Sequence, residues 1–339
     1  MNERYSRQEL FEPIGIAGQK KLKKKHVLIV GAGALGAGSA EMLVRAGIGK
    51  LTIVDRDYVE WSNLQRQQLY TEKDAEQRIP KAVAAKSRLM LVNSDVEIIS
   101  HTMDVSVKEM TTLVNGVDLI LDASDNFDIR MIINDISQKE RIPWIYSACV
   151  GSYGLSYTIV PDSTPCLNCL LEAVPMEGLT CDTVGIISPA VQMVLSIQIA
   201  EALKILVEDS TQLRKKLISF DLWKNHYSSI DVGKLWDKDC PSCGKNRTYP
   251  YLSYSSQLKT AVLCGRDTVQ IRPPHPVDRD LGKLSTVLSK LGREVFRNPY
   301  LLSFTTSDCR LVVFNDGRVL IHGTKSIDKA KSLYHRYLS

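Results

Sequence analysis

The chain has 339 residues, which exceeds one ordinary domain and suits a large α/β domain with a smaller one. Hydrophobic residues make up 44% and charged residues 24%, values that exclude wholesale disorder and allow a sizeable core. The net charge of +5 is modest, and no aromatic residues interleave with the lysines of residues 20–25. That basic run therefore predicts a solvated helix end and no nucleic-acid partner.

The N-terminus and the apolar stretches bear on location. Residues 1–7 lack the apolar core that a secretory signal needs. Polar residues interrupt the most apolar stretch, 189–207, so we expect a half-buried helix there and no membrane span. We therefore expect a cytoplasmic protein. In a reducing compartment the eight cysteines stay as free thiols, and their spacing becomes informative.

Short apolar strands alternate with helical segments in the first half of the chain. Residues 26–30 predict a strand, the glycine loop 31–36 follows, and residues 37–46 predict a helix. The further strands that the pattern predicts are 51–54, 96–99, 117–121 and 143–147. This alternation is typical of an α/β fold with a doubly wound, mostly parallel, Rossmann-like sheet.

The pattern changes after Gly154. A strand at 156–160, a loop at 175–189, the apolar helix and a strand at 217–221 are expected there. We place the boundary between a domain of residues 1–245 and a small α+β domain of residues 246–339 in a Tyr-, Ser- and Pro-rich linker. In that second domain, Asn315-Asp316-Gly317 predicts a hairpin turn, and 327–337 predicts a closing helix.

The glycine loop indicates a nucleotide. Gly31, Gly33 and Gly36 let the backbone approach a phosphate at the N-terminus of a helix, and Asp55 can accept a hydrogen bond from a ribose hydroxyl. These residues alone fit an NAD-dependent oxidoreductase as well as an ATP-binding enzyme.

The loop after Asp55 favours ATP. Residues 55–67 place acidic, amide and guanidinium groups on one β–α loop, whereas a dehydrogenase needs little there beyond the ribose contact. Arg66 offers a planar guanidinium that can form two hydrogen bonds to a phosphate, and Lys81 offers a compact positive charge. Both suit a polyphosphate whose negative charge shifts during reaction. Asp125 follows a predicted parallel strand, where such sheets open onto their ligands, and is a candidate Mg²⁺ ligand.

Four cysteines form two C-x-x-C pairs separated by roughly 70 residues: Cys166, Cys169, Cys240 and Cys243. Four thiolates close a tetrahedral Zn²⁺ site with no open position, which is structural rather than catalytic. The competing interpretation is a pair of redox-active dithiols. We expect zinc to clip two distant segments of the first domain together.

In combination these motifs resemble the MoeB/ThiF family of ubiquitin-activating-enzyme-like adenylyltransferases over about residues 1–245. The matching segments are 4–8, 31–36, 55–57, 62–67, 80–81, 122–126, both C-x-x-C pairs, and Cys181 with Gly185 and Pro189. The resemblance implies that Asp55 binds ribose within an ATP-binding set that includes Asp57. It implies phosphate binding by Asn63, Arg66, Gln67 and Lys81. Asp125 would serve Mg²⁺ and adenylation.

Two further residues take their roles from the resemblance. Members of the family are dimers in which the residue matching Arg7 reaches the ATP site of the partner, so a homodimer with composite sites is implied. Cys181 is the candidate for an acyl or persulfide link. Some relatives adenylate without that cysteine, so the covalent role stays open.

The function implied is ATP-dependent adenylation of the C-terminal glycine of a β-grasp sulfur-carrier protein. A carboxylate is already ionised at neutral pH, so the reaction needs no general base. We predict the molybdopterin-synthase small subunit as the carrier; the thiamin-thiazole carrier fits the sequence equally well. A sulfurtransferase or cysteine desulfurase is a further partner that the resemblance allows.

Other functions remain open from the sequence. They are an NAD-dependent oxidoreductase, an inactive zinc-bound scaffold, and an adenylating enzyme that modifies a tRNA base or a peptide. In the second domain Cys264-Gly265-Arg266 invites comparison with a sulfurtransferase of the rhodanese type. A β-like segment at 268–271 follows at once, and the domain is short for that fold, so we expect an α+β accessory domain instead.

Overall fold

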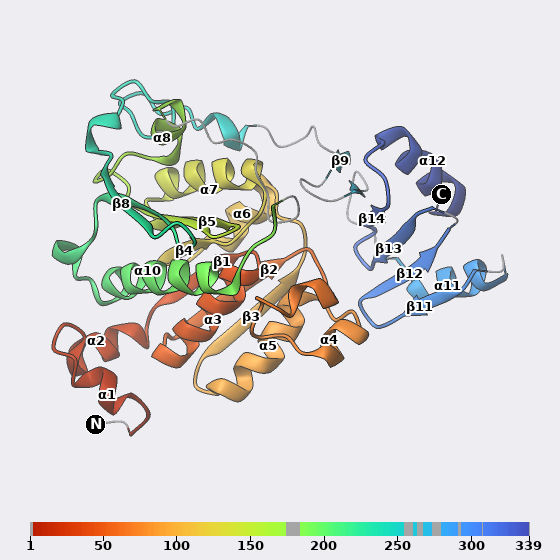
Figure 1. Ribbon diagram of the computed structural model, residues 1–339, viewed down its shortest axis with the longest axis horizontal. Helices are drawn as coiled ribbons and strands as arrows, with labels where there is room; N and C mark the ends of the chain where they lie inside the picture. The colour runs from red at the N-terminus through yellow and green to blue at the C-terminus, as the bar shows by residue number, and fades with distance from the viewer. Residues whose placement is uncertain are drawn as a thin grey trace. The chain divides into compact units, whose positions relative to one another are not determined.

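The computed structural model describes residues 3–173, 184–253, 260–262, 267–272, 279–290, 293–306 and 308–338 (Figure 1). The chain divides into two compact units. The N-terminal unit consists of Met1–Glu76 and Pro80–Ser255, and the C-terminal unit consists of Gln77–Ile79 and Ser256–Ser339. Cys181 and Cys264 lie outside the described residues.

The N-terminal unit is built on an eight-stranded sheet with the strand order β3-β2-β1-β4-β5-β6-β7-β8. Its strands are β1 His26–Val30, β2 Lys50–Asp55, β3 Glu97–Thr102, β4 Leu119–Asp122, β5 Trp144–Val150, β6 Tyr153–Ile159, β7 Lys216–Asp221 and β8 His226–Asp231. The first five are mutually parallel, and the last three pair antiparallel. The predicted mostly parallel Rossmann-like sheet is confirmed.

The register of β1 with its two neighbours gathers three strand ends at one edge of the sheet. Val30 pairs with Val54 of β2 on one side and with Asp122 of β4 on the other. The chain leaves all three strands at the same level, because parallel strands present their carboxyl ends together. This edge therefore carries the glycine loop, Asp55 and the turn after Asp122.

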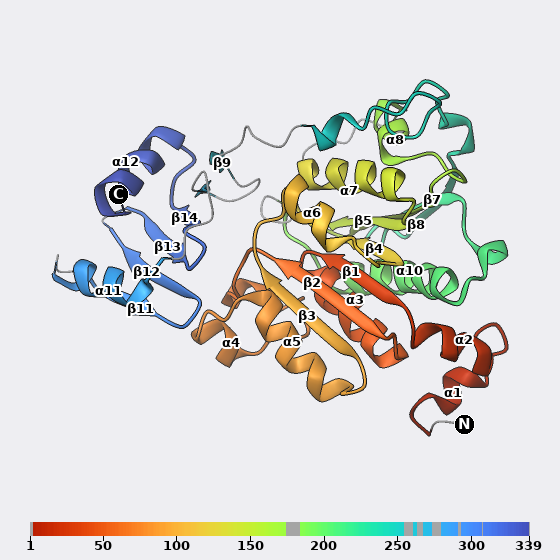
Figure 2. The same ribbon diagram turned by 180° about the vertical axis from the view of Figure 1, so that it is seen from behind.

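Helices cover both faces of this sheet (Figure 2). One layer consists of α3 Ala34–Ala46, α5 Lys81–Val92 and α10 Ser188–Val207, and the other of α6 Val107–Leu113, α7 Phe127–Glu140 and α8 Leu167–Ala173. The shorter α1 Ser6–Glu9, α2 Gly15–Leu22 and α4 Glu72–Glu76 complete the unit. A large apolar surface is thus buried on each side of the sheet.

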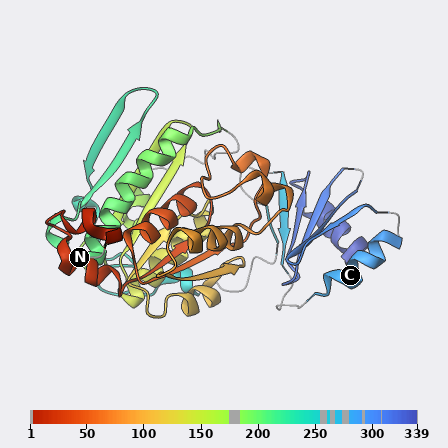
Figure 3. The same ribbon diagram turned by 90° about the horizontal axis from the view of Figure 1, so that it is seen from below.

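Helix α10 is long and apolar enough to cross a membrane by length and composition. It packs against β5, β6 and α3 instead, as Figure 3 shows from below. Gly38 of α3 allows this close approach, since a Cβ there would lie 2.2 Å from Leu195 Cδ1. The helix is therefore a core element of the N-terminal unit.

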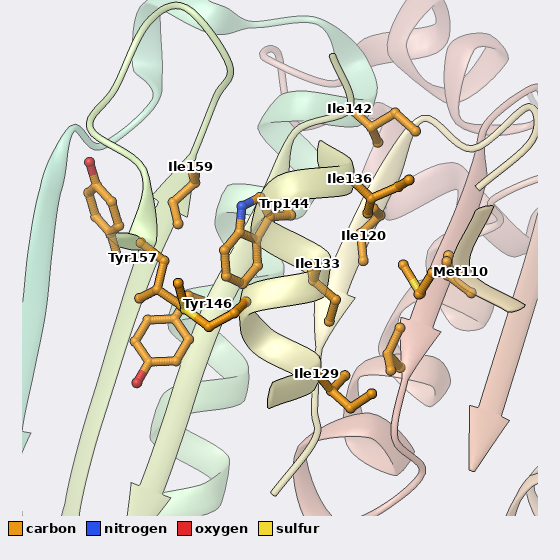
Figure 4. Close-up of a cluster of buried hydrophobic side chains, with 14 of the residues drawn as sticks. Met110, Ile120, Ile129, Ile133, Ile136, Ile142, Trp144, Tyr146, Tyr157 and Ile159 are labelled. Atoms are coloured by element: carbon orange, nitrogen blue, oxygen red, sulfur yellow. The ribbon is translucent and has the colours of Figure 1, made fainter. Parts of the chain in front are cut away.

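A hydrophobic cluster joins α7 to the sheet (Figure 4). Ile129, Ile133 and Ile136 are spaced four and three residues apart, so they share one face of the helix. They pack towards Ile120 of β4 and the fully buried Trp144 of β5. Burying each such side chain stabilises the fold by about 2 kcal/mol, and the packing fixes the turn that enters α7.

The C-terminal unit has a six-stranded antiparallel sheet with the order β11-β12-β13-β14-β10-β9. Its elements are β9 Thr260–Val262, β10 Thr268–Ile271, α11 Leu281–Lys290, β11 Val295–Arg297, β12 Leu301–Thr305, β13 Arg310–Phe314, β14 Val319–His322 and α12 Ile327–Leu338. The predicted hairpin at Asn315-Asp316-Gly317 joins β13 to β14, and Gly317 has a φ of +82°. A small α+β fold, as expected, is confirmed.

Two local differences from the sequence prediction have simple causes. Helix α3 begins at Ala34, three residues before the predicted start, because Gly33 already acts as its N-cap. Strand β8 was not predicted, since His226–Asp231 lies at the sheet edge, has no buried residue and shows no alternating apolar face.

Candidate functional site

The glycine loop is built by close backbone contacts. Gly31 has a φ of +101°, and a Cβ there would lie 2.4 Å from the carbonyl oxygen of Ala123. A Cβ on Gly36 would lie 1.9 Å from the carbonyl oxygen of Gly31. Both glycines are therefore required for packing the turn between β1, β4 and α3.

Gly33 differs from these two, because it faces open space. Only Gln67 Nε2 would lie within 4 Å of a Cβ there, at 3.9 Å. Helix α3 begins at the next residue, and none of the described side chains caps it. Its first backbone N–H groups are thus available to an anion such as a phosphate.

Asp55 ties the end of β2 to this loop. Its Oδ2 accepts a hydrogen bond from the Ala32 N–H at 2.5 Å, and its Oδ1 accepts one from the Asp57 N–H at 2.6 Å. Burial raises the pKa of the Asp55 carboxyl, and the nearby Lys81 ammonium opposes that rise. Each oxygen keeps a free lone pair, which can accept from a ribose hydroxyl.

Lys81 is the first residue of α5 and is only 3% exposed. Its Nζ lies 3.4 Å from Asp57 Oδ2, and its backbone N–H donates to the Asp57 carbonyl oxygen at 2.9 Å. Desolvating an ammonium group is costly unless anions surround it. Asp57 therefore fixes the position of the Lys81 ammonium group, and a fixed cation of this kind suits a polyphosphate site.

The loop after β2 contributes the amide and guanidinium groups. Asn63 Oδ1 accepts from the Glu60 N–H at 3.0 Å, and Arg66 Nη1 donates to the Ser62 carbonyl oxygen at 2.8 Å. Gln67 is 4% exposed, and its Oε1 has no hydrogen-bond partner within the described chain. An unpaired amide oxygen on a buried side chain whose nitrogen lies near Gly33 fits a ligand bound at this edge.

Asp125 is joined to the other strand ends by Arg56, which the sequence analysis did not select as a site residue. Arg56 Nη2 lies 3.4 Å from Asp125 Oδ1, and its Nη1 lies 3.6 Å from Asp104 Oδ1. Burial lowers the pKa of Arg56, but the carboxylates of Asp125, Asp104 and Asp57 outweigh it and raise that pKa. The Asp125 side chain is 63% exposed against 13% for Arg56, so its carboxylate stays accessible to a metal ion.

A second ion pair, also not predicted, holds the turn that carries Asp125. The buried Asp122 carboxylate accepts from Arg130 Nε at 3.0 Å and from the Ser124 hydroxyl at 2.6 Å. The Arg130 guanidinium lies 5.2 Å from the centre of the Tyr146 ring. Asp122 and Arg130 therefore position the turn, and no free charge from this pair faces the site.

Among the described residues predicted for the nucleotide site, Arg7 is the one that the fold of a single chain does not bring to this edge. It is exposed on α1, where the neighbouring Gln8 donates from Nε2 to the Ala46 carbonyl oxygen at 2.9 Å. Ala46 is the last residue of α3, whereas the glycine loop precedes its first residue. A helix of this length separates the two ends by about 20 Å.

The four cysteines of the two C-x-x-C pairs form one buried cluster, as predicted. Their Sγ atoms all lie within 4.8 Å of one another, and the Sγ–Sγ distances are 3.9 Å for Cys166–Cys169, 3.7 Å for Cys166–Cys240 and 3.5 Å for Cys169–Cys243. Four thiolates at Zn–S distances of about 2.3 Å sit about 3.8 Å apart in a tetrahedron. The donor set and its spacing fit zinc and leave no open position.

Comparison with known proteins bears on the whole arrangement. The profile of the ThiF family matches residues 5–242. The sulfur carrier protein ThiS adenylyltransferase of Bacillus subtilis (strain 168) is 55% identical over 338 residues, which cover 100% of both chains. The molybdopterin-synthase adenylyltransferase of Salmonella typhimurium (strain LT2) is 30% identical over 243 residues, or 71% of this chain and 96% of that protein. Among solved structures, E. coli MccB aligns with a TM-score of 0.63 at 22% identity over 73% of each chain, a similarity of fold.

Proposed function

Because the chain belongs to the ThiF family and is an adenylyltransferase, we propose that it activates the C-terminal glycine of the sulfur carrier ThiS. One observation carries the choice of carrier: the relative named for ThiS matches both units of the chain, at 55% identity. The relative named for molybdopterin synthase matches 71% of the chain at 30%. The molybdopterin-synthase small subunit is therefore the second candidate, although the sequence analysis placed it first.

The site geometry supports ATP binding at the carboxyl edge of the sheet. In the proposed complex Asp55 accepts from the ribose hydroxyls, and the phosphates approach Gly33 and the uncapped start of α3. Lys81, Arg66 and Gln67 would contact the phosphate oxygens, and Asn63 would hold the turn that carries Arg66 and Gln67. Asp125 would hold Mg²⁺, which supplies positive charge against the triphosphate.

The reaction then needs little beyond positioning. A carboxylate oxygen of the carrier's terminal glycine forms a bond to the α-phosphorus of ATP as the bond to the bridging oxygen of pyrophosphate breaks. No proton moves, because the attacking carboxylate is ionised at neutral pH. Lys81 and Arg66 offset the charge that develops on the departing pyrophosphate. The products are the carrier acyl-adenylate and pyrophosphate.

We propose a homodimer, and the position of Arg7 supports it. The candidate ATP site of the same chain lies at the other end of α3. In this proposal Arg7 therefore serves adenylation in a second copy of the chain. We propose composite sites of that kind, with one zinc bound per chain at Cys166, Cys169, Cys240 and Cys243. A sulfurtransferase or cysteine desulfurase would then deliver sulfur to the activated carrier.

ATP–pyrophosphate exchange tests the proposal. The purified protein is assayed without a carrier, with ThiS, with the molybdopterin-synthase small subunit, and with each carrier shortened by its last glycine. We expect exchange with intact ThiS and none with the shortened form, because the glycine carboxylate is the nucleophile. Exchange with the molybdopterin-synthase small subunit but not with ThiS would show that the small subunit is the substrate. No exchange with either of the two carriers would refute sulfur-carrier activation.

A further inference from the structure

The three residues that precede Pro80 and Lys81 belong to the C-terminal unit. Gln77–Ile79 groups with Ser256–Ser339, although the chain on both sides of it belongs to the N-terminal unit. Ile79 is bonded to Pro80, and Lys81 is the first residue of α5. The C-terminal unit thus includes the backbone that leads directly into the candidate phosphate-binding lysine.

Two residues of the C-terminal unit hold this segment: Phe296 of β11 and Asn298, which directly follows that strand. Asn298 Nδ2 donates to the Gln77 carbonyl oxygen at 2.8 Å and to the Arg78 carbonyl oxygen at 3.1 Å. The Arg78 guanidinium lies over the Phe296 ring, 4.7 Å from its centre. The segment is therefore fixed through both its backbone and a side chain.

The amide of Asn298 is itself fixed in this orientation. Its Oδ1 accepts from the Tyr300 N–H at 2.8 Å and from the Leu301 N–H at 2.9 Å. Its backbone N–H donates to the Leu301 carbonyl oxygen at 3.0 Å. With the amide oxygen held by the start of β12, the amide nitrogen must face Gln77 and Arg78.

The backbone that Asn298 holds is strained. Arg78 has a φ of +46°, a left-handed conformation that side chains other than glycine adopt at a cost. Pro80, two residues later, has little rotational freedom of its own. A change at Arg78 therefore passes into the first turn of α5, where the Lys81 N–H meets the Asp57 carbonyl oxygen.

We propose that Asn298 is a positioning residue for Lys81, acting through the backbone of Gln77 and Arg78. Asn298 would then influence the affinity for ATP through the backbone that leads into Lys81. The proposal rests on the proposed binding of ATP phosphates by Lys81. It gives the C-terminal unit a role in adenylation.

The sharpest test is Asn298→Asp in the full-length protein. Aspartate keeps the acceptor for Tyr300 and Leu301 but removes the donor and places a carboxylate oxygen against two carbonyl oxygens. We expect the Kd for ATP, measured by calorimetry without carrier, to rise about tenfold, because two hydrogen bonds to the strained segment are lost. Phe296→Leu, which removes the ring beneath Arg78, should also raise the Kd for ATP, but by a smaller factor.

The matched control is Asn315→Asp. Asn315 Nδ2 donates to the Pro299 carbonyl oxygen at 3.0 Å in the same unit, whereas the donor to Gln77 and Arg78 is Asn298. We expect the ATP affinity of the Asn315→Asp variant to equal that of the wild type, even where loss of the bond to Pro299 lowers its unfolding temperature. An Asn315→Asp effect as large as that of Asn298→Asp would overturn the proposal, since any local change in the unit would then suffice.

A double-mutant cycle separates positioning from general destabilisation. Lys81→Ala alone should weaken ATP binding, and adding Asn298→Asp to it should cause no further loss. Equal losses in both backgrounds, or unchanged ATP affinity in Asn298→Asp, would overturn the proposal. Because ATP binding is measured without carrier, a wild type that binds ATP but fails to exchange pyrophosphate would refute the proposed function and leave this test standing.

Discussion

Removing the metal from the four-cysteine cluster should destabilise the N-terminal unit by an amount that the chain geometry sets. Cys169 and Cys240 bracket about 70 residues, and a metal bound by the cluster would close that segment into a loop. In the chain-entropy treatment a cross-link over such a loop stabilises the fold by about 4 kcal/mol. For a unit of this size that corresponds to a fall of about 10 °C in Tm.

The assay combines metal analysis with calorimetry on full-length protein. We expect one zinc per chain in the wild type, loss of zinc in Cys240→Ser, and the fall in Tm in that variant and in chelator-treated wild type. After chelation the two proteins should melt at nearly the same temperature, because the cross-link is then absent from both. Cys149→Ser, outside the cluster, is the control and should keep its zinc.

Two results would refute this reasoning. Zinc retained in Cys240→Ser would show that the cluster is not the metal site. A metal-free wild type that melts at the temperature of the loaded protein would show that closing the loop contributes no stability, whatever the cluster binds.

Three further predictions address the site and its surroundings. Gly36→Ala should lower the free energy of unfolding by about 3 kcal/mol in denaturant titrations, because the new Cβ would lie 1.9 Å from a backbone oxygen. Gly33 faces open space, so Gly33→Ala should change stability little but weaken ATP binding about tenfold. Comparable stability losses in both variants would contradict this. Burial lowers the pKa of His26 from 6.5 in the folded protein. The contribution of His26 to stability is therefore full above pH 6.5 and is lost as the pH falls below that value. His26→Gln should flatten the acid side of the Tm–pH curve, and an unaltered curve would contradict the lowered pKa of His26. Arg7→Ala and Lys81→Ala should each abolish pyrophosphate exchange. When the two variant proteins are mixed in equal amounts and allowed to exchange subunits, about a quarter of wild-type activity should return, because half the dimers contain one copy of each variant and carry one intact site of two. No recovery would argue against composite sites.

Much of the nucleotide site could be predicted from the sequence, because its parts are local. The glycine loop follows an apolar strand directly, and Asp55 ends the next one, so strand, turn and helix signals fall within 30 residues. The spacing of the cysteines and the Asn315-Asp316-Gly317 turn are local in the same sense. Short-range backbone geometry dictates these features whatever surrounds them.

Other features depended on strand order, which no local pattern specifies. The order β3-β2-β1-β4 brings Asp104, which follows β3, and Asp125, which follows β4, to Arg56. This makes Arg56 part of the candidate site. The sequence showed Arg56 only as one charge among several.

The positions of Arg7 and Gln77–Ile79 were likewise decided by the tertiary structure. The sequence determined that Arg7 belongs to an N-terminal motif and that a segment precedes Pro80 and Lys81. Only the packing showed that Arg7 lies at the far end of α3 and that Asn298, over 200 residues later, holds the segment before Lys81. Contacts between residues so distant along the chain arise from how whole elements pack, and the residue types at either position do not encode them.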